Sequence, residues 1–304
     1  MSKLYFRASR SAMTQITELF DFVWPTVAGV WNLKWQVNGY LSLNPGANQD
    51  ELYNKFILGS GIHSVNFDAS IIKPTWEEQE GNFAKIILTN IFAIHESWLA
   101  ELIGIFNLGS TTHNTIKNLQ FPSSIRSAIS NLCSNESQML KNVFYNELIS
   151  NRKNSLSNLE NLQKCYRFFK ESRNCIVHNG GIADQKLINA YSDYYVVANT
   201  TALDVDEVPF INPVSLGSEI KVELRGGVGL CNIIIRIITT CDAELSKSIH
   251  AENEFKEHWK NSGEKGRTLS PNPTKRTTQI KRYVKKIGYP EPLIPLKYRG
   301  LKSV

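Results

Sequence analysis

Hydrophobic positions recur at helical spacing along most of the 304-residue chain. Apolar side chains that are three or four residues apart lie on one face of an α-helix. The spacing predicts helices over 14–38, 48–58, 77–107, 136–150, 155–178 and 227–258. A further short helix follows Pro122, with Ser123 or Ser124 as its N-cap. We therefore expect a mainly α fold, in which antiparallel helices form a bundle.

The first predicted helix contains a proline and a row of aromatic residues. Pro25 removes a backbone donor and crowds the preceding turn, so we expect an interruption there. Four aromatic side chains recur at spacings typical of one helix face, and we expect them in the core: Phe20, Trp24, Trp31 and Trp35.

The predicted helix 77–107 has almost no polar side, which indicates burial on several sides. It includes His95 and Glu96. We expect His95 to be a hydrogen-bonded core histidine, and a catalytic role is the alternative. The charged residues in this helix argue against a membrane span, so we expect no membrane partner.

The pattern changes after Gly180 and Gly181. Residues 194–198 and 219–224 form short β-like runs, and Pro209 and Pro213 lie between them. These runs predict a small β-hairpin or an ordered loop, inserted before the last long helix.

The C-terminal segment differs from the rest of the chain in charge. Residues 255–304 hold 13 Lys/Arg and 3 Asp/Glu, whereas the remainder has an excess of acidic residues. From 262 onward we expect an extended, proline-containing tail with one short helix at 277–287. The predicted organisation is an N-terminal helical extension (1–80), a helical bundle (81–258) and a basic tail (259–304).

Composition excludes several classes of protein. Hydrophobic residues make up 42% and charged residues 20%, as in a globular protein. No secretory signal is evident at the N-terminus, and the five cysteines are scattered, so we expect a reduced, cytoplasmic protein. His250, Glu254 and His258 lie on one helix face, where metal binding is conceivable but such rows are common on exposed faces. We expect neither a metal nor a cofactor.

The stretch ESRNCIVHNGG, residues 171–181, contains the main candidate site. An apolar stripe along the preceding helix leads to Arg173, which must therefore be paired or face a cleft or another subunit. His178 lies five residues later, which rotates it roughly 140° around the helix axis. A cooperative Arg–His pair thus requires a helix end, a distortion or a second chain. The two glycines favour a helix end.

An arginine, an amide and a histidine without metal ligands suit one reaction in particular. The guanidinium binds and stabilises a phosphate, and the imidazole transfers protons near neutral pH. Because RNA supplies its own 2′-hydroxyl nucleophile, metal-free RNA cleavage fits these groups best. The plain alternative is a surface histidine beside a salt-bridged arginine.

The segment YRFFKESRNCIVHNGG resembles the Arg-polar-x-x-x-His signature of the HEPN superfamily, which comprises helical-bundle proteins and includes metal-independent ribonucleases. The resemblance extends over roughly 83–250. It implies that Arg173 and His178 are the catalytic pair, that Asn174 orients them, and that two protomers form a composite site. Glu96 is similar in position to an acidic supporting residue of the family; alternatively it is a surface carboxylate paired with a base.

The resemblance implies a homodimeric endoribonuclease that cleaves RNA by 2′-hydroxyl attack and acts as an antiviral defence or toxin effector. The alternative is a non-catalytic HEPN-like module that binds RNA or a protein, and an antitoxin or other operon partner is conceivable. Four basic residues of the tail predict RNA contacts: Lys281, Arg282, Lys285 and Lys286. Alternatively, they form the solvated face of a helix that docks on the bundle.

Overall fold

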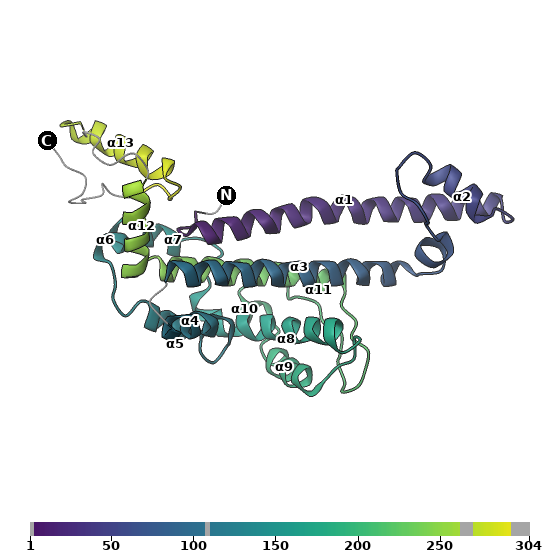
Figure 1. Cartoon of the computed structure of the whole chain (residues 1–304). Coiled ribbons are helices and arrows are strands. Elements are labelled where there is room, and N and C mark those ends of the chain that lie inside the picture. Colours follow the sequence, from purple (N-terminus) through teal and green to yellow (C-terminus); the bar gives the residue numbers. More distant parts are fainter. Residues whose placement is uncertain (1–2, 107–109, 262–269, 293–304) are drawn as a thin grey trace.

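The computed structural model describes residues 3–106, 110–261 and 270–292, and within these ranges the protein is a bundle of helices without β-strands (Figure 1). The α-helices are α1 (Arg7–Leu43), α2 (Gln49–Phe56), α3 (Trp76–Ile105), α4 (Ser110–Lys117), α5 (Ile125–Leu132), α6 (Gln138–Leu140), α7 (Asn146–Ile149), α8 (Leu159–His178), α9 (Gln185–Tyr195), α10 (Thr200–Leu203), α11 (Leu224–Leu245), α12 (Ile249–Asn261) and α13 (Pro273–Lys286). The mainly α prediction is therefore confirmed.

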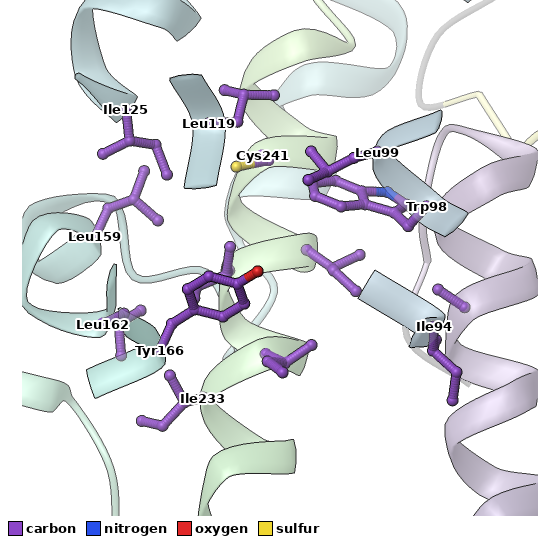
Figure 2. Close-up of a cluster of buried hydrophobic side chains, with 14 of the residues drawn as sticks. Ile94, Trp98, Leu99, Leu119, Ile125, Leu159, Leu162, Tyr166, Ile233 and Cys241 are labelled. Carbon is purple, nitrogen blue, oxygen red and sulfur yellow. The ribbon is translucent and has the colours of Figure 1, made fainter. Parts of the chain in front are cut away.

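Helices α3, α8 and α11 form the centre of the bundle. Figure 2 shows Trp98 of α3, Tyr166 of α8 and Ile233 of α11 converging in one apolar cluster. Helix α11 is buried on nearly all sides from Leu230 to Leu245. Its glycine-rich start permits close packing, because a Cβ at Gly226 would lie 2.4 Å from the carbonyl oxygen of Phe210.

Helix α1 runs beside α3, and the pair extends away from the bundle (Figure 1). The first half of α1 packs into the main core, from Tyr5 to Val23. The second half packs with α2 and the turn at Asp68–Ile72 around a small separate cluster: Val37, Leu52, Ile57, Phe67 and Ile71. The predicted short helix at 48–58 is confirmed as α2, which begins with a capping box from Asn48 and Glu51.

The predicted interruption at Pro25 is wrong. Helix α1 is continuous through Pro25 over 37 residues. The proline lies on the exposed side of the helix. Its ring and the backbone carbonyl that loses a partner therefore face solvent, where water satisfies the carbonyl and no packed neighbour is displaced.

Three of the four aromatic side chains in the row on α1 are not core, contrary to the prediction, whereas Phe20 is partly buried and packs against the main core. The exposed fraction is 46% for Trp24, 39% for Trp31 and 60% for Trp35. These rings contact one another or nearby rings instead, and Trp31 makes edge-to-face contacts with Trp76 at 4.7 Å and with Trp35 at 5.5 Å between centroids. The reason is that this half of α1 extends beyond the helices that would cover it.

The predicted β-hairpin is also wrong, and the alternative of a loop is correct. Residues 194–195 end helix α9, and residues 205–223 form an irregular segment. This part of the chain contains an isolated antiparallel β-bridge between Ile182 and Glu219, which is too short to be a strand. Helix α9 itself was not predicted, although Asp184 caps it by accepting a hydrogen bond from the Leu187 N–H at 2.9 Å.

The predicted helix 227–258 is two helices, α11 and α12, separated at residues 246–248. The break is stabilised by pairing with a distant segment, since Ser137 N donates to Lys247 O at 2.7 Å and Ile249 N donates to Asn135 O at 2.9 Å. In the tail, the expected helix 277–287 begins earlier, at Pro273. The other expectations for the tail, that residues 262–269 and 293–304 are extended, lie outside the described residues.

Helix α3 is long and apolar enough to cross a membrane by length and composition alone. Half of its most apolar window is buried inside the bundle, however. A helix buried in a protein core can have the same length and composition.

Candidate active site at the end of helix α8

Arg173 lies on the face of α8 that is directed toward α3. Its Nη2 donates to Oε1 of Glu96 at 2.9 Å, and its guanidinium carbon lies 5.5 Å from the centre of the Phe92 ring. The side chain is only 18% exposed. Arg173, which interrupts the apolar stripe of α8, is therefore paired with Glu96 of the same chain.

A second cation shares this carboxylate. Lys170 lies one turn before Arg173, with Nζ 3.8 Å from Oε1 of Glu96 and 2.5 Å from Oε1 of Gln120. Burial lowers the pKa of Lys170, while Glu96 opposes that change. Two cations and one carboxylate leave this part of the surface positive, which suits an anionic ligand.

Among the described residues no hydrogen bond joins Asn174 to either member of the predicted catalytic pair. Its Nδ2 donates to Oε2 of Glu171 at 3.2 Å. Glu171 is buried and forms an ion pair with Arg167, with 2.5 Å between Oε1 and Nη2. The structure thus ties Asn174 to a buried ion pair within α8.

His178 is the last residue of α8 and is exposed. Among the described residues no hydrogen bond, ion pair or ring contact involves it. The predicted helix end is confirmed: the N–H groups of Asn179 and Gly181 both donate to the Cys175 carbonyl, and Gly180 and Gly181 have φ of 59° and 82°. The chain therefore does not bring Arg173 and His178 into contact.

Apolar side chains are exposed around His178. Val177 is 51% exposed, Ile182 is 45% exposed and Leu216 is 63% exposed. The turn at 181–183 is joined to the segment at 217–220 by hydrogen bonds such as Ala183 N to Ser218 O at 2.9 Å. The exposed side chains of Val177, Ile182 and Leu216 are therefore carried by the end of α8, the turn that follows it and the segment paired with that turn.

The prediction that His95 is a core histidine is confirmed. The ring is fully buried, with Nδ1 3.2 Å from the hydroxyl of Tyr166. Burial, together with the charge of Lys170, lowers the pKa of His95 to about 3, so the imidazole is neutral. His95 is therefore part of the core and is not exposed at the candidate site.

The basic residues of α13 are placed on a docked helix. Ile280 and Val284 are buried against the main core, which fixes the helix. Lys281 forms an ion pair with Glu291 at 2.8 Å. The remaining predicted RNA-contact residues of α13 are exposed: Arg282, Lys285 and Lys286. Helix α13 therefore has a buried apolar side, as a docking helix does, and an exposed basic side.

Sequence reasoning identified the row of His250, Glu254 and His258 but missed the arginines that lie beside it. Glu254 and His258 of α12 lie near Arg7 and Arg10 of α1, which are far away in sequence. The described residues contain no group of three or more His, Cys, Asp or Glu side chains placed to hold a metal ion. The acidic and histidine row on α12 is visible in the sequence, whereas its arginine neighbours depend on how α1 packs.

No protein-family model matches the sequence, and neither a curated protein nor a solved structure matches it.

Proposed function

We propose that the chain is a HEPN-type, metal-independent endoribonuclease that acts as a homodimer in the cytoplasm, as an effector of antiviral defence or as a toxin. One observation carries the proposal. A single helix holds an anchored arginine, fixed by Glu96, and ends five residues later in an exposed histidine with no partner in the described chain.

In this proposal Arg173 binds the phosphate. Glu96 engages Nη2, and Nη1 has no hydrogen-bond partner among the residues described, so it remains for a phosphate oxygen. A guanidinium held in place stabilises charge that develops on the phosphorane without reorganising. Lys170 adds positive charge one turn away.

His178 transfers protons. As a base it removes the 2′-hydroxyl proton while that oxygen attacks the adjacent phosphorus, and the bond to the 5′-oxygen breaks. The leaving oxygen takes a proton from an imidazolium, which gives a 2′,3′-cyclic phosphate and a free 5′-hydroxyl. Asn174 is proposed to orient the active site through its bond to Glu171.

A second copy of the chain completes the site. Arg173 and His178 make no contact within one chain, and their offset of roughly 140° around α8 keeps them apart. The exposed side chains Val177, Ile182 and Leu216 supply apolar surface beside His178 for a partner to cover. An antitoxin or another operon partner is a further candidate for that surface.

The test is cleavage of single-stranded RNA by the purified protein in the presence of EDTA. We expect Arg173→Ala and His178→Ala each to reduce the rate by about a hundredfold or more, since each removes a group that acts in the transition state. Arg225→Ala is the matched control, because this exposed arginine pairs only with Glu207 in the described structure. Equal rates for all variants contradict the proposal.

A non-catalytic RNA-binding module is the second candidate. The exposed basic side of α13 favours it, because binding alone requires no histidine. RNA affinity without cleavage, unchanged in His178→Ala, is the result that selects this candidate.

A further inference from the structure

Two adjoining cavities lie where the start of α1 meets α12. One, of about 560 Å³, is lined by α1, α12 and the end of α13. The other, also about 560 Å³, is lined by α1, the end of α3 and α12. Arg7 and His258 line both, so the cavities meet at these side chains. Their volumes are within the range of small-molecule sites.

The first cavity has a cationic lining. Among the described residues that line it there is no carboxylate, and the polar side chains are Arg7, Arg10, His258, Asn261, Lys286 and Tyr289, whose hydroxyl lies 2.8 Å from Nδ1 of His258. Arg7 is exposed and has no hydrogen bond or ion pair within the described chain. An unpaired guanidinium at the mouth of a cavity binds phosphate well, because its donors match the phosphate oxygens.

Arg10 is held in position for the same ligand. Its Nη1 donates to the backbone carbonyls of Leu4 at 2.9 Å and Tyr5 at 2.5 Å. Its Nη2 faces Gly288, since a Cβ added there would lie 3.6 Å from that nitrogen. Gly288 lines the cavity, so the backbone bonds direct the second nitrogen of the guanidinium toward it.

The second cavity offers acceptors. Glu254 of α12 lines it, and Oε2 of this residue is buried without a hydrogen-bond partner among the residues described. Buried polar atoms are nearly always satisfied, so a ligand that brings an N–H donor fits this position. Ile105 and the ring of His250, which lies 5.3 Å from Phe106 between centroids, give the cavity a partly apolar wall.

We propose that the joined cavities bind a free nucleotide, with its phosphate on Arg7 and Arg10 and the amino group of its base on Glu254. A nucleotide carries an anionic group and a flat, amino-bearing base on one sugar, which matches the two halves of the site. The site lies on α1 and α12, so it is separate from the proposed catalytic residues of α8.

The test is isothermal titration calorimetry of the full chain at fixed ionic strength. The probes are AMP, adenosine, CMP, UMP and inorganic phosphate. We expect AMP to bind, adenosine to bind much more weakly, and inorganic phosphate to compete with AMP. CMP is expected to bind more tightly than UMP, whose base has no amino group.

Arg7→Gln is the diagnostic variant, because Arg7 forms no hydrogen bond or ion pair within the described chain. It is expected to weaken AMP binding about tenfold or more, the loss for a charge-assisted hydrogen bond. Arg225→Gln removes the same charge from another exposed arginine and is expected to leave AMP binding unchanged. Circular dichroism of both variants verifies that they are folded.

Several results overturn the proposal. The first is equal affinity for AMP and adenosine, and the second is an equal loss of AMP affinity in Arg7→Gln and Arg225→Gln. The third is equal affinity for CMP and UMP. The fourth is binding of a 5′-phosphorylated RNA without any binding of free nucleotides. Because the readout is binding, the proposal stands or fails independently of RNA cleavage.

Discussion

At the scale of single residues, the ion pair between Arg173 and Glu96 is the most informative contact of the candidate site. Exposed salt bridges contribute little, but Arg173 is only 18% exposed and its Nε is buried without a partner. Removing one partner of such a pair leaves an uncompensated charge. Glu96 therefore keeps the guanidinium at the surface of α8, in one orientation.

We predict that Glu96→Gln lowers the rate of RNA cleavage about tenfold without unfolding the protein. The amide retains an acceptor for Arg173 but loses the charge that orients the guanidinium. Cleavage kinetics and thermal unfolding measure the two effects. Glu18→Gln, an exposed carboxylate on α1, is the matched control, and equal rates for the two variants would count against a positioning role for Glu96.

A buried carboxyl group, Asp242, and a partly buried one, Glu254, have raised pKa values. Asp242 accepts hydrogen bonds from the backbone N–H groups of Tyr5 at 2.6 Å and Phe6 at 2.9 Å, yet burial raises its pKa to about 6. Burial also raises the pKa of Glu254 to about 7. Both residues lie beneath the start of α1, so the docking of that helix is coupled to pH.

The free energy of unfolding is predicted to fall as pH rises from about 4 to about 7. The folded state binds the Asp242 proton more tightly than the unfolded state does, so this stabilisation is present below the unfolded pKa of 3.8 and is lost as pH rises through about 6. The difference between the folded and unfolded pKa values of Asp242 corresponds to about 3 kcal/mol. Urea unfolding across this range is the measurement.

Asp242→Asn is expected to flatten this slope, whereas Asp193→Asn, an exposed residue of α9, is expected to retain it. If the free energies of unfolding of wild type and Asp242→Asn change in parallel with pH, the carboxyl group of Asp242 is not the source of the pH dependence.

At the scale of elements, helical periodicity predicted most helices but not where they are interrupted. The continuity of α1 through Pro25 depends on the exposure of that side of the helix. The break between α11 and α12 depends on backbone pairing of 247–249 with 135–137. Both features depend on neighbours in space that a local pattern does not contain.

Pro25→Ala is predicted to stabilise the protein by about 1–3 kcal/mol. The substitution restores the missing backbone donor inside a helix that is already formed, and alanine is the best helix former. Chemical unfolding of the two proteins measures the gain. Pro273→Ala is the control, because Pro273 is at the start of α13, where proline costs little, and should change stability far less. A destabilised Pro25→Ala protein would show that the ring itself is needed.

At the scale of the whole molecule, the candidate site is open on one side. His178 is exposed and is bordered by the exposed apolar side chains Val177, Ile182 and Leu216. Under the proposed function a second copy of the chain binds this surface, so catalysis requires dimerisation.

Val177→Asp is predicted to convert the dimer into a monomer and to abolish most RNA cleavage, because it places an unpaired charge in the proposed interface. Sedimentation equilibrium gives the mass, and cleavage is measured on the same sample. Leu58→Asp is the control: Leu58 is 68% exposed near α2, and this variant should remain dimeric and active. A dimeric, active Val177→Asp protein would place the interface elsewhere.

The sequence by itself determined most of the helices, the requirement that Arg173 have a partner, and the end of α8 at Gly180 and Gly181, because these follow from local periodicity and backbone preference. Tertiary structure alone decided that the partner of Arg173 is Glu96, 77 residues earlier in the chain. It also decided that Trp35 is exposed and that Arg7 meets α12. The physical reason is that spacing defines which side of a helix is apolar, whereas packing decides what covers that side.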